Sequence, residues 1–365
     1  MKKAVNKIQT FTKTHERFLF PAFLVLGFIV DYITLNRVDQ VFDNIILFFY
    51  LLLASSMIFF IYIQSINSDE NIKFKRLNDF SPLIFQYAIG GLFSGLFIFY
   101  FRSGSFGASF PFLIVLFALM LGNEYFYRRF PKMRFQLIIF FIALLSYVNL
   151  VIPVIIKKIG TLVFLISTLI ASVLMYFFVI GLFKAIHYIK NTILIDERNK
   201  VIKSLTITLC LFLVFYFANL IPPIPLSMKA GGIFHNVLRS SNNEFLIVRE
   251  DIPWYLPFHT YNSTFKNDGN GVYAFASIFA PAKLTTKIYH QWSFYDGKKG
   301  WVEKERIPIE IYGGREDGFR GYSFKQNIQE GLWRVDIETE RGQIIGRMRF
   351  TVVNGEPKNL EQINF

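Results

Sequence analysis

The first 222 residues contain seven apolar stretches, each close to the length that a helix needs to cross a bilayer. About 20 helical residues span a hydrocarbon core of roughly 30 Å. Because lipid offers no hydrogen-bond partner to a peptide group, only a helix satisfies its own backbone over such a stretch. The sequence therefore predicts seven transmembrane helices, over Phe18–Leu35, Phe42–Ile63, Pro82–Phe101, Phe106–Tyr127, Phe135–Ile152, Gly160–Ile189 and Ile202–Ile221.

The composition and the charge fit a membrane chain. Hydrophobic residues make up 53% of the chain and charged residues 18%, against about 25% charged in an average soluble protein. Lys and Arg exceed Asp and Glu by 11 over residues 1–222 (21 against 10) and by 2 over residues 223–365 (18 against 16). The net charge of +13 therefore belongs mainly to the apolar half, which favours membrane topology over a nucleic-acid partner. The one cysteine, Cys210, excludes a disulfide scaffold.

The basic residues predict which way the chain faces, because Lys and Arg collect in cytoplasmic loops. With the N-terminus inside, the cytoplasmic segments hold 17 of them and the opposite loops hold 4, namely Arg37, Arg102, Lys157 and Lys158. No small-residue cleavage site follows the first apolar stretch, so an uncleaved first helix is expected. An odd number of spans then places the C-terminal part outside. We expect a multi-pass protein of the bacterial cytoplasmic (inner) membrane, partnered by the lipid bilayer, with its C-terminus extracytoplasmic.

The sequence changes character at Ile221–Pro225, where prolines end the last helix. Short stretches with alternating apolar residues follow, which is the pattern of half-buried strands. We predict an all-β, immunoglobulin-like antiparallel sandwich. Its seven strands are expected over Phe245–Arg249, Gly271–Phe279, Thr285–Tyr295, Trp301–Ile311, Gly321–Gln326, Trp333–Ile337 and Met348–Val352. The predicted organisation is a cytoplasmic N-terminus (1–17), a seven-helix transmembrane domain (18–222), a connector (223–243), an extracytoplasmic β-sandwich (244–354) and a C-terminal tail (355–365).

Two acidic residues, Asp31 and Glu124, lie inside predicted spans. Ionisable groups are costly in lipid and often mark ion or proton paths. Both residues lie near predicted interfaces and near opposite faces of the membrane, so a structural role is the simpler interpretation. Gly91 and Gly95 form a small-xxx-small spacing, which lets two helices approach closely. Packing within this chain is the simplest interpretation of that spacing.

Aromatic and cationic side chains are the candidates for ligand binding in the β-region. His290 and Trp292 alternate onto one face of a predicted strand, in a core or in a groove. Arg315 and Arg320 lie among glycines and aromatic residues, which fits an anionic or carbohydrate ligand, or a hairpin loop with local ion pairs. The candidate set is His290, Trp292, Arg315, Arg320, Tyr322, Trp333 and Arg334. No metal-ligand spacing or nucleophile motif is present, so we assign no catalytic residue, metal or cofactor.

Short motifs in this region occur in a specific order. They are Ile288-Tyr289-His290-Gln291-Trp292, Lys298-Lys299-Gly300-Trp301, Arg306-Ile307, Gly313-Gly314-Arg315, Arg320-Gly321-Tyr322-Ser323, Trp333-Arg334-Val335, Gly346-Arg347 and Phe350. Together, over about residues 283–352, they resemble the bacterial domain of unknown function 2914. The resemblance implies a membrane-associated bacterial protein with this domain at the C-terminus, and supplies no activity. Gln291 stands where His-Arg-Trp is expected, so no role is carried over for that arginine.

Three functions follow from these observations as alternatives. The first is a binding protein whose periplasmic β-sandwich holds an envelope component, either an envelope polymer or a membrane protein partner. The second is a transporter or channel component with the β-domain as an accessory lid. The third is an envelope-modifying enzyme. The lack of a recognisable catalytic motif favours the first.

Overall fold

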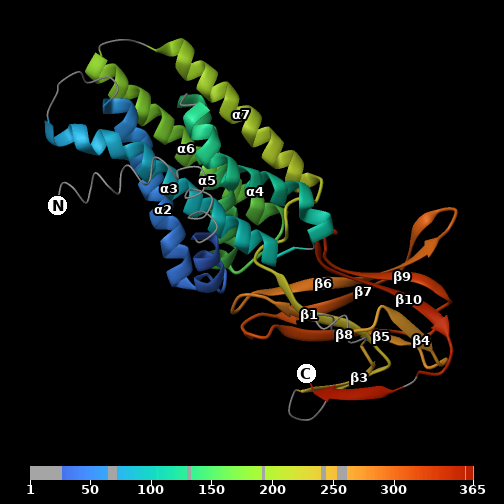
Figure 1. Ribbon diagram of the computed structural model, residues 1–365. Coiled ribbons are helices and arrows are strands. Elements are labelled where there is room, and N and C mark those ends of the chain that lie inside the picture. Colours follow the sequence, from blue (N-terminus) through green and yellow to red (C-terminus); the bar gives the residue numbers. More distant parts are fainter. Residues whose placement is uncertain are drawn as a thin grey trace, which may run out of the picture. The chain divides into compact units, whose positions relative to one another are not determined.

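Figure 1 shows the protein as a computed structural model. The structure describes residues 27–64, 72–104, 106–129, 133–190, 194–239, 244–252, 261–357 and 359–364, and at 72–80, 106–108, 123–129 and 190 it describes the backbone alone. The chain divides into two compact units. The first contains most of the helical residues. The second consists of Tyr100–Phe112, Asn149–Ile166 and Leu213–Phe365, and so includes the β-domain.

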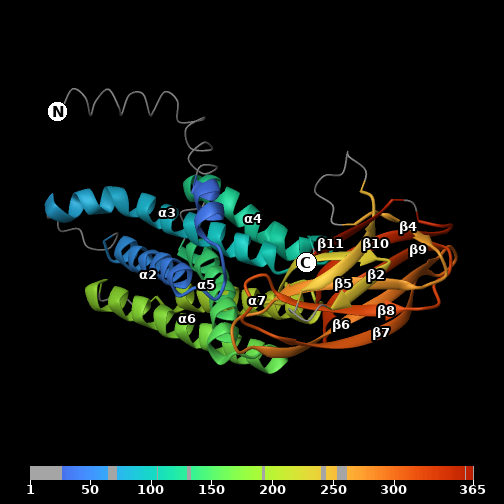
Figure 2. The ribbon, with the colours of Figure 1, turned by 90° about the horizontal axis from the view of Figure 1, so that it is seen from below.

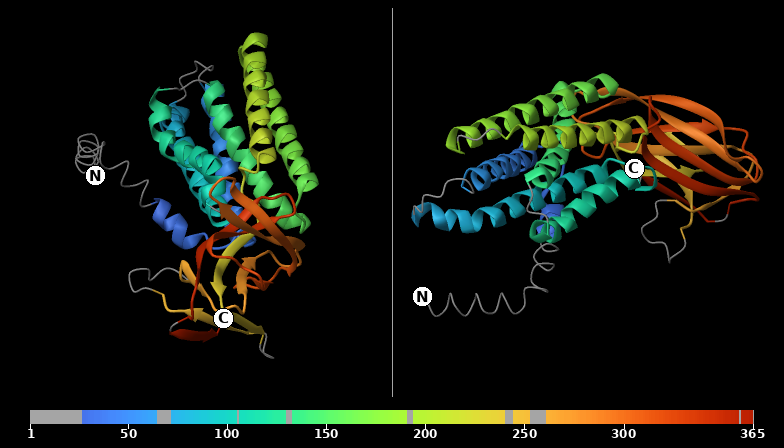
Figure 3. Two further views of the ribbon diagram at one scale, coloured as in Figure 1. Left: turned by 90° about the vertical axis from the view of Figure 1, so that its right-hand side faces the viewer. Right: turned by 90° about the horizontal axis from the view of Figure 1, so that it is seen from above.

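The helices overlap the predicted apolar stretches, although the third begins at Ile72 and not at Pro82, and the seventh covers Ile195–Phe217 and not Ile202–Ile221. They are residues 27–34, α2 (Val41–Gln64), α3 (Ile72–Arg102), α4 (Phe106–Arg129), α5 (Met133–Ile156), α6 (Thr161–Lys190) and α7 (Ile195–Phe217). The start of the first predicted span lies outside the described residues. Five helices are long and apolar enough to cross a membrane: α2, Ser81–Arg102 of α3, α5, Thr161–Ile189 of α6, and α7. In α4 the apolar part is shorter, Ser109–Gly122. The consecutive helices α6 and α7 lie side by side (Figure 3).

Two glycines allow α3 to pack closely against α2. A Cβ atom on Gly91 would lie 2.8 Å from a ring carbon of Tyr50, and one on Gly95 would lie 2.5 Å from Leu47 Cδ2. The small-xxx-small spacing therefore serves a contact within this chain. At the start of α2, the buried carboxylate of Asp43 accepts two backbone N–H groups of the preceding turn at 3.0 and 3.3 Å. That carboxylate is satisfied by the local backbone, which fits a structural role.

The β-domain consists of three sheets (Figures 1 and 2). The large sheet has the order β4-β10-β9-β6-β7, the middle sheet β1-β5-β8, and the small sheet β11-β3-β2. Neighbouring strands are antiparallel except β4 and β10, which are parallel. The strands are β1 (Ser227–Phe234), β2 (Asn236–Arg239), β3 (Phe245–Glu250), β4 (Thr264–Asn267), β5 (Val272–Phe279), β6 (Thr285–Asp296), β7 (Gly300–Tyr312), β8 (Phe319–Lys325), β9 (Gly331–Thr339), β10 (Ile344–Asn354) and β11 (Leu360–Asn364).

All seven predicted strands are present, as β3 and β5 to β10. The expected connector at 223–243 instead contains β1 and β2, and the expected tail at 355–365 contains β11. The short strand β4 was also not predicted. Because β1 is the partner of β5 in the middle sheet, the domain begins at Ser227 and not at residue 244. With a third sheet and a parallel pair, the immunoglobulin-like connectivity stays a prediction.

Two apolar cores hold the three sheets together. The first lies between the large and middle sheets and includes Ala274, Ala276, Ile278, Trp292, Trp333, Val335, Ile337 and Phe350. The second lies between the middle and small sheets and is formed by Phe234, Val237, Phe245, Ile247 and Phe275. The middle sheet is therefore covered on both faces, which explains why β5 reads as almost continuously apolar. In β9 and β10, buried residues mostly alternate with more accessible ones, so their other face is turned outward, with Asp336 as a buried exception on that face.

Candidate functional site

Three of the candidate residues lie in the core of the β-domain. His290 and Trp292 are 0% exposed and Trp333 is 2% exposed. The Trp292 indole N–H donates to Ser323 Oγ at 3.0 Å, and His290 Nδ1 lies 2.9 Å from the same oxygen. The Trp333 indole donates to the carbonyl oxygen of Gln329 at 2.9 Å. These contacts assign the three side chains to the packing between the large and middle sheets.

The surroundings of His290 keep its ring neutral. Burial lowers the pKa of His290 from 6.5 to about 3, because the cation would lose its hydration. Its Nε2 has no hydrogen-bond partner among the residues that the structure describes. A general base has to reach a proton of its substrate, whereas this ring is enclosed. The geometry therefore fits a core role better than a catalytic one.

The next three candidates belong to β8 and the turn before it, at the edge of the middle sheet. Arg315 is exposed in that turn. Arg320 Nη2 lies 3.9 Å from Asp317 Oδ2, which is a local ion pair of the kind that the hairpin-loop interpretation expects. Tyr322 is 41% exposed and its ring contacts aromatic rings of β3 and β5. These three residues share no strand pairing with Arg334, which belongs to the large sheet.

Arg334 lies on the outward face of the large sheet. In the antiparallel pair of β9 and β10, Arg334 is opposite Arg349, and Asp336 is opposite Arg347. Residues directly opposite each other share a face of a sheet. The alternate residues of both strands point into the core, so these four point away from it. We call Arg334, Asp336, Arg347 and Arg349 the arginine cluster.

One carboxylate, that of Asp336, contacts two of the three guanidinium groups of this cluster. Arg347 donates to both oxygens of Asp336, from Nε at 2.6 Å and from Nη2 at 2.9 Å. Arg334 Nε lies 3.0 Å from Asp336 Oδ2 without hydrogen-bond geometry. The Arg334 guanidinium also lies over the ring of Trp301, 4.5 Å from its centroid. Arg349 is exposed and forms no ion pair with any residue in the described ranges.

Positive charge is in excess within the cluster. Burial lowers the pKa of Arg334; Asp336 opposes this effect, while Arg347 and Arg349 add to it. Like charges directly opposite each other on a sheet are destabilising. Glu303 on β7 is a second carboxylate that acts on Arg334. Arg334 and Arg347 share Asp336, and Arg349 lies opposite Arg334 on the same face. This set of guanidinium groups, beside an indole, suits the binding of a carboxylate, sulfate or phosphate group.

Of the predicted ligand-binding residues, the structure places only Arg334 in this cluster. Sequence reasoning missed Asp336, Arg347 and Arg349 as a group. The signal was present, since polar residues alternate with apolar ones in both strands. The Arg341-Gly342 turn makes the two strands a hairpin, with Gly342 at a φ of 83°. The hairpin register then decides which residues become neighbours, and a turn of different length would have separated them.

The two intramembrane candidates are not brought together by the described residues. Asp31 lies in the helical stretch 27–34 and is half-buried. Glu124 lies on α4, where the structure describes the backbone alone. Across the described ranges, no three His, Cys, Asp or Glu side chains gather to hold a metal ion.

Residues 285–352 match a family described as a protein of unknown function, DUF2914. The match confirms the resemblance and runs from β6 into β10, so it includes the arginine cluster. The C-terminal part of the chain therefore carries a DUF2914 domain. No curated protein matches the chain. A solved structure of Pseudomonas fluorescens alkylpurine DNA glycosylase AlkC, bound to DNA containing an abasic site analog, matches with 8% identity, 87% of this chain and 99% of that chain covered, and a TM-score of 0.22. A TM-score this low carries no argument about fold or function.

Proposed function

We propose that this chain is a multi-pass protein of a bacterial cytoplasmic membrane whose β-domain, on the extracytoplasmic side, binds an anionic envelope polymer at the arginine cluster. The observation that carries the proposal is the surplus of positive charge on this face, where Arg334 and Arg347 share Asp336 and Arg349 forms no ion pair with any described residue. The transport and enzyme hypotheses stay predictions from the sequence.

The membrane placement is supported by five apolar helices and by the distribution of basic residues. A further observation agrees with an extracytoplasmic β-domain. The segments Tyr100–Phe112 and Asn149–Ile166 include two of the three loops that hold few basic residues, and both belong to the same compact unit as the β-domain. Loops on one side of a membrane and a domain on that side are expected to contact each other.

The binding role is supported by the chemistry of the cluster. Arg347 is held by two hydrogen bonds to Asp336, whereas Arg349 is exposed and without an ion pair among the described residues. A guanidinium group donates in a fork that matches carboxylate, sulfate and phosphate oxygens. Trp301 lies beside Arg334 and adds an aromatic surface of the kind on which a sugar ring packs. An anionic polymer of sugars offers an anionic group for the guanidinium and a sugar ring for the indole in each repeating unit.

Reporter fusions test the placement. Alkaline phosphatase joined after Phe365 is expected to be active, because it folds and works only outside the cytoplasm, and a cytoplasmic fluorescent reporter at the same position is expected to be dark. An inactive phosphatase with a fluorescent cytoplasmic reporter would overturn the orientation.

A pair of polymers that differ only in charge tests the binding. The full chain in a non-ionic detergent is expected to bind dextran sulfate and not dextran. Arg349→Gln removes one charge-assisted contact, worth about 1.5–3 kcal/mol, and is expected to weaken binding about tenfold or more. Lys298→Gln removes an equal charge from the exposed β6–β7 turn and is the matched control. Equal binding by the two variants would show that total charge, and not the cluster, holds the polymer.

A further inference from the structure

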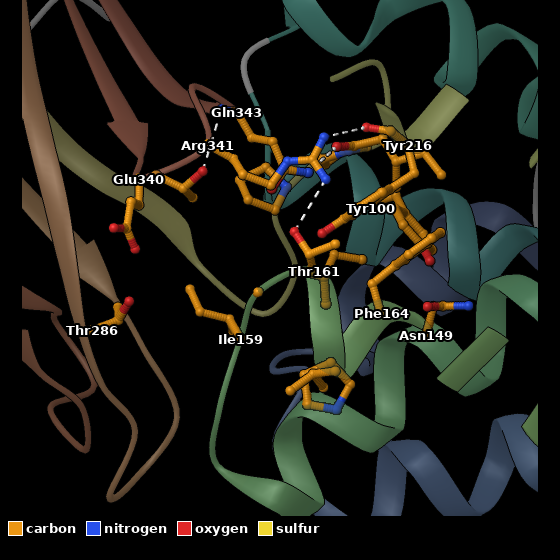
Figure 4. A pocket seen from close by; sticks show the side chains of 18 residues that line it. Tyr100, Asn149, Ile159, Thr161, Phe164, Tyr216, Thr286, Glu340, Arg341 and Gln343 are labelled. Atoms are coloured by element: carbon orange, nitrogen blue, oxygen red, sulfur yellow. Dashed lines mark hydrogen bonds between the residues drawn. The ribbon is translucent and has the colours of Figure 1, made fainter. Parts of the chain in front are cut away.

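A cavity of about 340 Å³ lies within the second compact unit (Figure 4). The end of α5, the start of α6, the end of α7 and the segment Ile221–Ile224 line it on one side. The β9–β10 turn and Thr286 of β6 line it on the other. At about 30 Å³ per water, this volume is larger than a single small ion needs, and it falls within the range of small-molecule pockets.

One cation, Arg341 of the β9–β10 turn, reaches into this cavity. Its Nη2 donates to the carbonyl oxygen of Tyr216 and to Asn219 Oδ1, both at 3.2 Å, and Nη1 donates to Thr161 Oγ1 at 3.4 Å. The guanidinium also lies 4.2 Å from the centre of the Tyr216 ring. In return, Asn219 Nδ2 donates to the carbonyl oxygen of Arg341 at 3.2 Å. The cation is therefore held in a fixed position at the ends of α6 and α7 (Figure 4).

Every acceptor of Arg341 is neutral, and no described carboxylate forms an ion pair with it. Glu340 also lines the cavity, but its carboxylate lies on the β-domain side, away from the guanidinium (Figure 4). The carbonyl end of α7 offsets part of the charge, since helix C-termini favour cations. Arg341 is half-buried, and a charge withdrawn from water without a counter-charge is unfavourable. An anion in the cavity would supply the missing counter-charge.

The rest of the lining favours an anion that carries an apolar part. Ile159, Val163 and Phe164 at the start of α6, with Pro222 and Ile224 after α7, form apolar walls. The start of α6, with Thr161, lines the cavity. A helix N-terminus also favours negative charge, so its effect adds to that of Arg341.

We infer that this cavity binds the phosphate headgroup of an anionic amphiphile. The guanidinium of Arg341 contacts the phosphate, and the apolar walls contact the glycerol or the first carbons of the chain. The cavity lies at the ends of α5, α6 and α7, three helices long and apolar enough to cross a membrane, which is the level at which lipid headgroups are found. The identification of the ligand as a bilayer lipid rests on the proposed membrane placement. The identification of the bound group as a phosphate rests on Arg341 and does not depend on that placement.

Native mass spectrometry of the full chain, released from detergent micelles, tests the inference by counting bound lipid. Phosphatidylglycerol is expected to bind about tenfold or more tightly than phosphatidylcholine, whose headgroup carries no net charge. Arg341→Gln is expected to reduce the affinity for phosphatidylglycerol about tenfold or more. Lys298→Gln, which removes an equal charge from an exposed turn, is expected to leave that affinity unchanged.

A second variant keeps the test valid should Arg341→Gln fail to fold. Thr286→Phe adds bulk to the cavity and leaves Arg341 in place, so it is also expected to weaken phosphatidylglycerol binding while the tryptophan fluorescence spectrum stays native. Equal binding of both lipids, or undiminished binding by Arg341→Gln and Thr286→Phe, overturns the inference. If inorganic phosphate displaces bound phosphatidylglycerol as effectively as added lipid does, the site binds free phosphate. That result overturns the lipid as the ligand and keeps the phosphate site. Reporter fusions test the orientation separately, so the two failures are distinguishable.

Discussion

Lowering the pH should destabilise the β-domain through one residue, His290. Its pKa in the folded chain is about 3, against about 6.5 in an unfolded chain. Between these two values the unfolded chain binds a proton that the folded chain excludes, so the free energy of unfolding falls as the pH falls. The contribution is full above pH 6.5 and decreases by about 1.4 kcal/mol per pH unit well below it. From pH 7 to pH 5 the loss is about 2 kcal/mol.

Tryptophan fluorescence reports on this domain in the intact protein, because all four tryptophans lie between residues 254 and 333. Urea unfolding of the full chain in detergent is measured at several pH values for the wild type and for His290→Gln, which does not titrate. Other titrating groups contribute equally to both proteins, so the difference between the two curves isolates His290. That difference should change by about 2 kcal/mol between pH 7 and pH 5.

Parallel curves for the two proteins would refute the reasoning. They would mean that His290 takes up its proton in the folded state, with a pKa near that of a solvated imidazole. The ring would then be reachable by water, and its assignment to the core, and with it the argument against a catalytic histidine, would fail.

Two further predictions use matched pairs of substitutions and the same unfolding assay. Ser323→Ala should lower the free energy of unfolding by about 1–3 kcal/mol, because the Trp292 indole N–H loses its acceptor in the core. Ser293→Ala should leave it nearly unchanged, because that buried hydroxyl has no hydrogen-bond partner in the described ranges. A similar cost for both would show that lost volume, and not the hydrogen bond, dominates. Gly313→Ala should lower the free energy of unfolding by about 3 kcal/mol, since its Cβ would overlap the backbone oxygen of Pro281. Gly297→Ala, with nothing within 4 Å of the added atom, should change stability little. Equal effects of the two substitutions would contradict the close packing at Gly313.

The helices and seven of the strands were predictable because their patterns are local. Five of the helices contain an apolar stretch of the required length. In β9 and β10 apolar residues that point into the core alternate with polar residues. The four missed strands lack such a pattern. In β1, Gly231 and Gly232 resemble a linker, although bulk at Gly231 would meet Met228 and the backbone of Phe275. In β11 almost every residue is exposed, so no alternation appears.

The candidate site was less predictable, because it depends on which strands become neighbours. The sequence indicated that Arg334 points away from Trp333, and likewise that Arg347 and Arg349 point away from Met348. It did not indicate that Arg334 and Arg349 lie opposite each other, which follows from the register of β9 and β10. His290 and Ser323 meet in the core although 33 residues separate them, and they come from different sheets. Contacts of this kind follow from the packing of whole sheets.

The limits of the family match do not coincide with a unit that can fold. Residues 285–352 supply four strands of the large sheet and β8, but β1 and β5, which cover the inner face of that sheet, come from upstream. Cut at those limits, the segment would expose two buried tryptophans to water and leave β8 without its ladder partner. A polypeptide with only this segment would therefore have to borrow two strands from another chain, by donor-strand exchange or by dimerisation.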